Sequence, residues 1–321
     1  FKARIGANES VFGPSPQAIA AMTQAAAECW MYCDPENHAL KNALAAELGV
    51  KPENVVVGEG IDSLFGYTVR MFVEPGAGDK VLTSLGAYPT FNFHVTGYGG
   101  KLVTVPYVDD REDPASLLDA AHTHSPKLVY FANPDNPMGT WWGAGEVQRL
   151  IDGIPDGTLL VLDEAYSEFA PAGTLPPIDV SNPKVLRYRT FSKAYGMAGA
   201  RIAYAVGEAS VIKSFDKIRN HFSVNRIAQA GALAALADRA YLESVKDKVA
   251  AARAEISRIA ERHQLKPLAS ATNFVAIDCR RDGVFAKRVL DELIARDVFV
   301  RMPGPAPLNR CIRVSAGTEA D

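Results

Sequence analysis

The sequence predicts an α/β fold, in which a mostly parallel sheet lies between helices and a smaller α+β domain follows. Three observations predict it. Helical and strand-like segments alternate through the first two thirds of the chain. The strand-like segments are short apolar runs without polar alternation, which is typical of strands buried on both faces of a sheet. After about residue 207 the alternation ends, and a long helical stretch leads into a mixed segment.

The elements follow in order from the N-terminus. Phe1 to Gly6 resembles a strand. A helix should begin at Ser15-Pro16, because serine caps helix N-termini and proline favours the first helical position. A second helix is expected from His38 to Leu48, ended by Gly49. The strands expected next are 55–57, 81–83, 102–105, 128–132, 159–162 and 185–188.

The C-terminal third has a different pattern. Residues 208–263 are almost all helical in period, with no strand signal. A strand near 273–277, a helix over 284–295 and strands at 298–301 and 311–314 are expected after it. These patterns predict a large domain over residues 30–207 and a small domain made of residues 1–29 and 208–321. Because the first residue is not Met, and residues 317–321 resemble a helix start, we expect both ends to be trimmed.

Composition excludes several classes of protein. The 321 residues are 48% apolar and 22% charged, as in a globular protein with a substantial core. The net charge of −3 favours neither nucleic acid nor an anionic membrane as a partner. No apolar run has the ~18–20 residues of a membrane helix, and no signal peptide is evident. The four cysteines lack zinc-ligand spacing, so we expect no metal and a reducing cytoplasm.

The strongest local signal is the segment Thr190–Gly196, with Arg201 eight positions after Lys193. Serine and arginine are both good phosphate ligands. Lys193 could bind phosphate as a point charge, or it could form a Schiff base with a carbonyl cofactor. Taken alone the segment is weak evidence, because most lysines are solvated surface groups.

Three more segments lie where predicted strands end. Asp163-Glu164 follows the strand 159–162, the loop Asn133–Gly139 follows 128–132, and Gly58–Ser63 follows 55–57. Active sites of open α/β sheets lie at the carboxyl ends of strands, and a helix N-terminus offers free N–H groups to a phosphate. Each segment alone is equally compatible with an ordinary turn.

Together these segments resemble the fold-type-I aminotransferases that use pyridoxal 5′-phosphate (PLP). The order and spacing match across nearly the whole chain, with 27 residues from Asn136 to Asp163 and 30 from Asp163 to Lys193. Within that superfamily the chain is most similar to the histidinol-phosphate aminotransferases. The stretches that carry this closer resemblance are Ala7–Ser10, Tyr32–Asn37, Ala87–Phe91, Asp163–Tyr166 and Ile312–Thr318. The resemblance implies an aspartate-aminotransferase-like fold.

The resemblance also implies roles around the cofactor ring. Lys193 would hold PLP covalently and move the proton during transamination. Asp163 would pair with the ring nitrogen, while Tyr166 and Asn136 would contact the ring hydroxyl. Phe91 falls where an aromatic ring stacks on the pyridine, a position at which many relatives have tyrosine.

A second group of residues is implied in phosphate binding. The phosphate would be held by the turn before a helix and by two side chains further along the chain, namely Gly60, Ile61, Asp62, Ser192 and Arg201. Relatives often have serine where Ile61 stands, so its contact should come from the backbone alone. Tyr32 resembles a tyrosine that reaches the cofactor phosphate of the neighbouring subunit, which implies a homodimer with shared active sites.

The substrate contacts are less closely specified. Arg313 matches the arginine that binds the substrate α-carboxylate, for which a planar guanidinium is suited. Arg301 could face a distal acidic group or lie on the surface, and Asn8 belongs to a turn that covers the active site in relatives. His221 and Arg226 either line the pocket or lie on a helix surface. Histidinol phosphate, an aromatic amino acid and a related phosphorylated amine all remain open as substrates.

The sequence therefore predicts a PLP-dependent aminotransferase, with histidinol phosphate and 2-oxoglutarate as the first candidate substrates. One alternative is another PLP reaction on the same fold, such as an aromatic or broad-specificity aminotransferase, or a decarboxylase of phosphorylated amino acids. The other is a ligand-sensing module of a transcription regulator, whose basic helix-turn-helix has no counterpart in this sequence.

Overall fold

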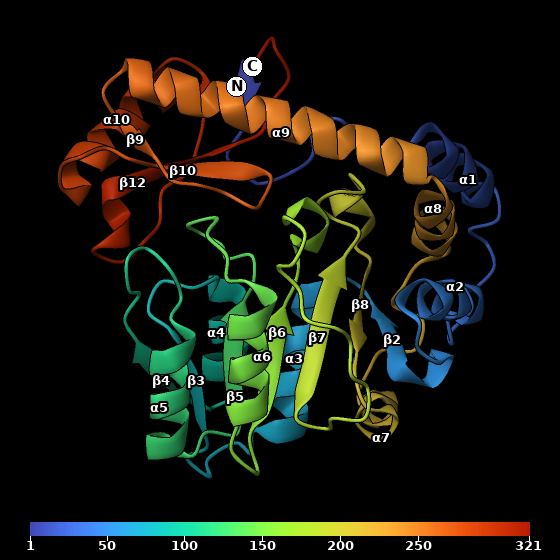
Figure 1. The fold of residues 1–321 in the computed structure, drawn as a ribbon. Coiled ribbons are helices and arrows are strands. Elements are labelled where there is room, and N and C mark those ends of the chain that lie inside the picture. The colour runs from blue at the N-terminus through green and yellow to red at the C-terminus, as the bar shows by residue number, and fades with distance from the viewer.

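The computed structural model describes all residues 1–321 and contains a seven-stranded sheet at its centre. The strands, in spatial order, are β2 (Val55–Gly58), β8 (Ala203–Val206), β7 (Val185–Thr190), β6 (Leu159–Asp163), β5 (Leu128–Ala132), β3 (Lys80–Ser84) and β4 (Lys101–Val105). Both neighbours of β8 pair with it antiparallel, and every other neighbouring pair is parallel. The carboxyl ends of six strands therefore meet at one edge of the sheet (Figure 1).

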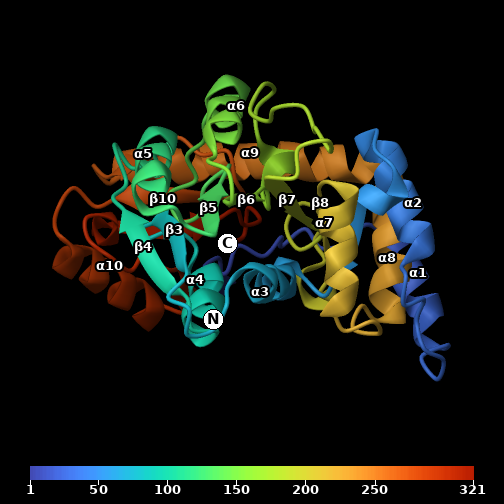
Figure 2. The same ribbon diagram turned by 90° about the horizontal axis from the view of Figure 1, so that it is seen from below.

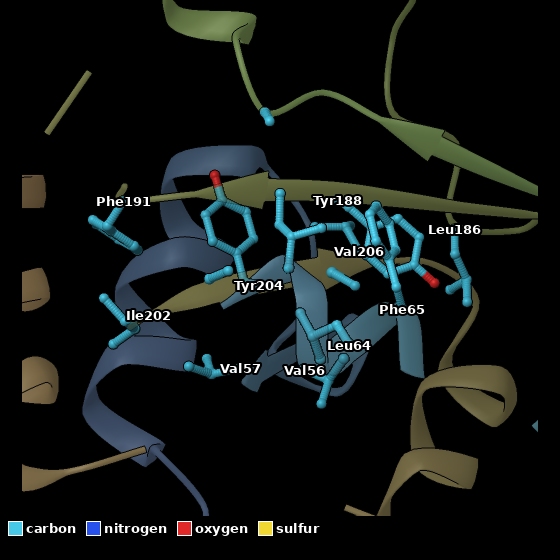
Figure 3. Close-up of a cluster of buried hydrophobic side chains, with 14 of the residues drawn as sticks. Val56, Val57, Leu64, Phe65, Leu186, Tyr188, Phe191, Ile202, Tyr204 and Val206 are labelled. Carbon is cyan, nitrogen blue, oxygen red and sulfur yellow. The ribbon is translucent and has the colours of Figure 1, made fainter. Parts of the chain in front are cut away.

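Helices cover both faces of this sheet. α3 (Ile61–Phe72) and α4 (Pro89–Gly97) lie on one face, and α5 (Pro114–His124) and α6 (Ala144–Gly153) lie on the other (Figure 2). Successive strand residues point to opposite faces. Tyr130 accordingly packs into the core with α3, whereas Phe131 packs with α5 and α6. Figure 3 shows part of the first core, in which Phe65 of α3 lies against Tyr188 of β7.

The smaller unit contains a three-stranded antiparallel sheet in the order β12 (Cys311–Ser315), β10 (Phe274–Asp278) and β9 (Lys266–Pro267). α10 (Gly283–Ala295) packs on it. Near the N-terminus, β1 (Ala3–Arg4) pairs in parallel with β11 (Val298–Phe299), which brings the start of the chain to this unit. The long helix α9 (Arg239–Arg262) runs across the top of both parts (Figure 1).

The remaining helices close one end of the large sheet (Figure 1). They are α1 (Pro16–Ala26), α2 (His38–Leu48), α7 (Ala209–Ser214) and α8 (Arg226–Ala237). α1 packs closely on α8, where Gly231 allows the approach because any Cβ there would meet Met22 at 2.6 Å. Single 3₁₀ turns occur at 52–54, 167–169, 198–200, 215–217 and 308–310. No helix combines the length and the apolar character needed to cross a membrane.

Most sequence-based elements are confirmed. Ser15 caps α1 by accepting a hydrogen bond from the Ala18 N–H at 3.1 Å, and α2 spans His38–Leu48 and ends at Gly49 in a left-handed conformation. The six expected strands of the large sheet are present, although β4 is an edge strand that is only partly buried. The division into a large domain over residues 30–207 and a small domain of residues 1–29 and 208–321 stays a prediction.

The expectations miss one strand and are wrong at the C-terminus. β8 was not foreseen, because its sequence Ala-Tyr-Ala-Val has too few large apolar side chains to stand out as a buried strand. Residues 208–263 are mostly helical, as expected, and a loop over 218–225 divides them, after which Asn225 caps α8 by accepting from the Ala228 N–H at 2.8 Å. Residues 317–321 form turns rather than a helix start.

Candidate active site

The sheet order places three of the sequence-predicted segments side by side. β5, β6 and β7 are consecutive neighbours, so the chain segments that follow them meet at the same edge. A cavity of about 280 Å³ lies there, lined by residues of both the large sheet and the smaller unit. Most of the sequence-predicted residues line this cavity, namely Asn8, Ile61, Asp62, Asn136, Asp163, Tyr166, Ser192, Lys193, Arg201, Arg301 and Arg313.

Lys193 has the properties of a reactive amine. It follows β7, and its Nζ donates a hydrogen bond to the Asn8 carbonyl at 3.2 Å. The pKa of the Lys193 ammonium is lowered to about 8. Burial is the main cause, repulsion from Arg313 adds to it, and the charge of Asp163 opposes both. A larger fraction of this amine is therefore neutral near physiological pH than for a solvated lysine, and only the neutral amine can attack a carbonyl.

Asp163 is a buried carboxylate at the last position of β6. Its carboxylate accepts hydrogen bonds from the Tyr130 hydroxyl at 2.7 Å and from the Ala165 N–H at 2.9 Å. Burial nevertheless raises the pKa of Asp163 to about 6, because these two bonds only partly replace water. A cationic N–H placed against this carboxylate would stabilise its charged form.

A hydrogen-bond network joins the two units across the cavity. The Tyr166 hydroxyl accepts from the side-chain amides of Asn8 at 3.0 Å and Asn136 at 3.4 Å. Burial raises the pKa of that hydroxyl well above its usual value, so Tyr166 stays neutral and can donate. The Arg313 Nη1 donates to the Asn136 carbonyl oxygen at 2.6 Å, and its Nη2 donates to the Gly6 carbonyl at 3.2 Å.

Arg313 lines the cavity and keeps donors that have no partner in the protein. Its Nε is buried and has no hydrogen-bond partner in the protein. Burial lowers the pKa of the guanidinium, which is a sign that the site lacks a full complement of anionic partners. Arg301 lies beside it, because their backbones exchange hydrogen bonds of 3.2 and 2.6 Å. The Arg301 side chain is exposed, and its guanidinium lies 5.7 Å from the Phe299 ring centre.

The opposite end of the cavity has the features of a phosphate site. Gly60 precedes α3 with φ of 97° and provides no side-chain cap, so the first N–H groups of that helix are free for a ligand. A Cβ at Gly60 would lie 2.2 Å from an Arg201 nitrogen, so only glycine allows this guanidinium to approach the turn. Ser192 lines the same cavity. The Asp62 side chain is directed to His94, 3.0 Å away, so only its backbone is suited to an anion.

These three features correspond to the three reactive or charged groups of PLP. Lys193 offers an amine for the aldehyde, Asp163 an unpaired buried charge for the ring nitrogen, and the Gly60–Arg201 turn a cradle for the phosphate. The buried, partnerless Arg313 Nε is placed for a further anion. The residues of this chain therefore fit PLP and an anionic substrate.

The structure does not bring every predicted residue to the cavity. Phe91 does not line the cavity, because it is fully buried and stacks on Tyr130 at 4.9 Å, and its expected contact with the cofactor ring stays a prediction. Tyr88, three positions earlier, lines the cavity together with Tyr166. His221 is exposed, and Arg226 pairs with Glu28 at 3.1 Å outside the cavity, so both lie on the surface in this chain.

Three residues to which the sequence analysis gave no role contribute to the site. Tyr88 directly precedes α4 within the recognised stretch Ala87–Phe91, where the choice between neighbouring aromatics could not be made without the backbone. Tyr130 could have been found, because β-strand alternation places it on the same face of the sheet as the end of β6. Glu9 also lines the cavity and pairs with Arg4 at 3.3 Å.

A second cavity, of about 350 Å³, lies between α2 and α7. Its charged side chains largely neutralise one another, since Arg219 bonds Asp216 at 2.7 Å and Glu36 at 3.0 Å. It holds no counterpart of the group formed by Lys193, Asp163 and Arg313, and we assign the chemistry to the cavity around Lys193.

Comparison with known proteins agrees with this geometry. The sequence profile of aminotransferase class I and II matches residues 2–321. Histidinol-phosphate aminotransferase 1 of Mesorhizobium japonicum is 34% identical over 99% of this chain and 87% of that protein. The histidinol-phosphate aminotransferase of Sinorhizobium meliloti, solved in complex with PLP, is 56% identical with a TM-score of 0.98, over 99% of this chain and 87% of that one. A Thermus thermophilus aspartate aminotransferase variant, 24% identical over 100% of this chain and 93% of that one, shares the fold with a TM-score of 0.85.

Proposed function

The chain belongs to the class I and II aminotransferases, and from this premise we propose that it is a PLP enzyme that transfers the amino group between L-histidinol phosphate and 2-oxoglutarate. The observation that carries the proposal is the single cavity that joins Lys193, Asp163 and two arginines, in a chain whose relatives of comparable length are histidinol-phosphate aminotransferases. The reaction would then be a step of histidine biosynthesis.

PLP, when bound, supplies an electron-withdrawing ring that stabilises the carbanion left by removal of the substrate α-proton. Lys193 would hold the cofactor covalently through its Nζ. As a free amine it would hold and move the proton at the substrate Cα, a task for which its lowered pKa of about 8 is suited. Its bond to the Asn8 carbonyl fixes its direction while no donor is present.

Each residue around the cofactor ring would make one kind of contact with it. Asp163 keeps a proton on the ring nitrogen, and the Tyr130 hydroxyl at 2.7 Å keeps the carboxylate oriented. Tyr166 and Asn136 provide the donors for the ring hydroxyl. Tyr88, rather than Phe91, is the aromatic ring that we assign to the pyridine face.

The phosphate of the cofactor would lie at the other end of the cavity. Ile61 and Asp62 contribute free N–H groups at the start of α3, and Gly60 forms the turn before them, with its own N–H bonded to the Gly58 carbonyl at 2.8 Å. Ser192 and Arg201 add a hydroxyl and a guanidinium, both of which are good phosphate donors.

The two arginines suit the two amino donors. Glutamate has a carboxylate directly on Cα, whereas histidinol phosphate has a phosphate one carbon further out in that place. Arg313 lies deep in the wall with free donors, which fits the carboxylate. Arg301 lies beside it with an exposed guanidinium, which fits the phosphate that extends one carbon further out than the carboxylate.

We also propose that the enzyme is a homodimer located in the cytoplasm. Tyr32 and Trp30 are 81% and 82% exposed on the connection between α1 and α2, and the Tyr32 ring packs on Phe222 at 4.8 Å. Exposed neighbouring aromatics of this kind are typical of interfaces between subunits. All four cysteines are unpaired, which suits a reducing compartment.

The test is a half-reaction. The PLP form is mixed separately with L-histidinol phosphate, L-phenylalanine and L-glutamate, and the conversion of the cofactor to its pyridoxamine form is followed by absorbance. Fast conversion by histidinol phosphate and slow conversion by phenylalanine is expected. Conversion by phenylalanine alone would make the protein an aromatic or broad-specificity aminotransferase, and release of carbon dioxide without a keto acid would make it a decarboxylase.

Substitution of Arg301 refines the same test. Arg301→Gln should raise the KM for histidinol phosphate about tenfold, the effect of losing one charge-assisted hydrogen bond, and change the KM for glutamate much less. Equal effects on both donors would contradict the assignment of Arg301 to the phosphate.

A further inference from the structure

Two carboxyl groups lie buried against each other behind the cavity wall. Glu112 precedes α5 and is 1% exposed, and Asp135 lies in the loop Asn133–Gly139 and is 2% exposed. Their side chains are within hydrogen-bonding reach of each other. Two ionised carboxylates in contact away from water repel strongly, so one proton must be shared between them.

The hydrogen bonds show which acid holds the proton. Both Asp135 oxygens accept, one from the Tyr107 hydroxyl at 2.8 Å and the other from the Met138 N–H at 3.0 Å. One Glu112 oxygen accepts from the Ala132 N–H at 3.2 Å, and the other is buried without a hydrogen-bond partner, as is the neighbouring Ser84 hydroxyl. A proton on that second oxygen would turn it into a donor to Asp135, which satisfies both groups.

Asp135 also holds the loop in shape. Its N–H donates to the Thr140 carbonyl at 2.9 Å, and its own carbonyl accepts from the Gly139 N–H at 3.1 Å. The next residue is Asn136, which contacts both the Tyr166 hydroxyl and the Arg313 guanidinium. Any movement of Asp135 is therefore transmitted directly to the residue that orients Arg313.

We propose that Glu112 is a positioning residue, which stays protonated and donates a hydrogen bond to Asp135, and that this bond holds Asn136 in place to orient Arg313 for the substrate anion. The role of Arg313 in this statement rests on the proposed function, whereas the shared proton does not. Glu112 itself touches neither the cavity nor a ligand.

The groups around the pair determine how it responds to pH. Tyr107 and Tyr130 face it, both with their pKa raised by burial and so neutral, and Arg313 is the cation whose charge acts on Asp135. Burial raises the pKa of Asp135 to about 7 and that of Glu112 well above its usual value. The proton is thus present at neutral pH and is lost as the pH rises, when the carboxylates repel and the loop moves.

Infrared spectroscopy tests the shared proton without substrate or cofactor. The apoprotein at mildly alkaline pH should show the carbonyl band of a protonated carboxylic acid, and Glu112→Gln should remove it. Glu168→Gln is the matched control, because Glu168 is another acid whose pKa burial raises, to about 7, but it lies outside the loop. A band that persists in Glu112→Gln, or that Glu168→Gln removes instead, would overturn the proposal.

Kinetics test the positioning. Glu112→Gln keeps a donor for Asp135 and an acceptor for the Ala132 N–H. Its KM for glutamate should therefore match the wild type at neutral pH and stay constant at higher pH, where loss of the shared proton raises the wild-type KM. Glu112→Leu removes both, and its KM should rise about tenfold, with PLP retained. Equal KM increases in the two variants, or an unchanged KM in Glu112→Leu, would refute the positioning role even if the infrared band behaves as expected.

Discussion

Replacing Arg313 with lysine should raise the KM for glutamate about 10- to 150-fold. A guanidinium has five N–H donors, of which the structure assigns one to the Asn136 side chain and one to the Gly6 carbonyl. Three remain, enough for both oxygens of a carboxylate. An ammonium has three donors, so a lysine that kept both protein contacts would have one left. The loss is one charge-assisted bond of ~1.5–3 kcal/mol, and this free energy corresponds to the roughly 10- to 150-fold rise in KM.

The assay is the half-reaction with glutamate, measured over a range of concentrations in Arg313→Lys and the wild type. The dissociation constant of PLP, measured by cofactor fluorescence, is the internal control and should stay within about twofold, because Arg313 lies at the end of the cavity away from the Gly60 turn. Arg301→Lys is the matched variant, since it changes the neighbouring arginine whose guanidinium is exposed.

A KM for glutamate that is unchanged in Arg313→Lys would refute the carboxylate role. A parallel loss of PLP affinity would refute it in another way, because the substitution would then have disturbed the whole site. The larger truncation Arg313→Ala should cost more than lysine does, since it also leaves the Asn136 carbonyl oxygen without its donor.

Three further predictions concern the cofactor. Lys193→Ala should abolish covalent PLP attachment, and label retained after borohydride reduction would exclude Lys193 as the attachment site. In the wild-type apoprotein the rate of PLP attachment should increase as the pH rises through about 8, because only the unprotonated amine reacts and burial lowers its pKa to that value; a midpoint near the ~10.4 of a solvated lysine would contradict this. Gly60→Ala should weaken PLP binding, because its Cβ would collide with Arg201, whereas Gly76→Ala introduces similar backbone strain in open space and should change only the melting temperature.

Most of the predicted site residues in the large domain lie at strand ends, whereas Arg313 lies within β12 of the smaller unit. Lys193, Asp163 and Asn136 follow three apolar runs, and parallel strands in one sheet bring such ends together whatever the intervening helices do. Their spacing along the chain was therefore enough to expect one site. The same reasoning identified the Gly60 turn, which follows β2. Strand β8 is antiparallel to both β2 and β7, so β2 runs in the same direction as β7 and ends at the same edge of the sheet.

The sequence did not predict which aromatic side chain faces the cavity, because this depends on how α4 is rotated about its axis and not on the order of residues along the chain. Phe91 and Tyr88 lie three residues apart at the start of α4, so either could face the cavity until the helix is oriented. Packing decides between them. The Phe91 ring enters the core, against Tyr130 at 4.9 Å and Phe65 at 5.4 Å, and this leaves Tyr88 at the cavity. An apolar ring gains more from that burial than a tyrosine would, since the tyrosine hydroxyl would need a partner in the core.

Glu112 shows a different limit of sequence interpretation. In the sequence it lies in an acidic turn, Asp109-Asp110-Arg111-Glu112, and such clusters are usually solvated. In the fold one member is drawn inside, against an acid of a loop that follows a different strand. A buried pair of acids is costly unless a proton is kept between them. Its presence directly behind Asn136 therefore indicates that the cost is offset by what the pair holds in place, a loop whose geometry sets the orientation of Arg313.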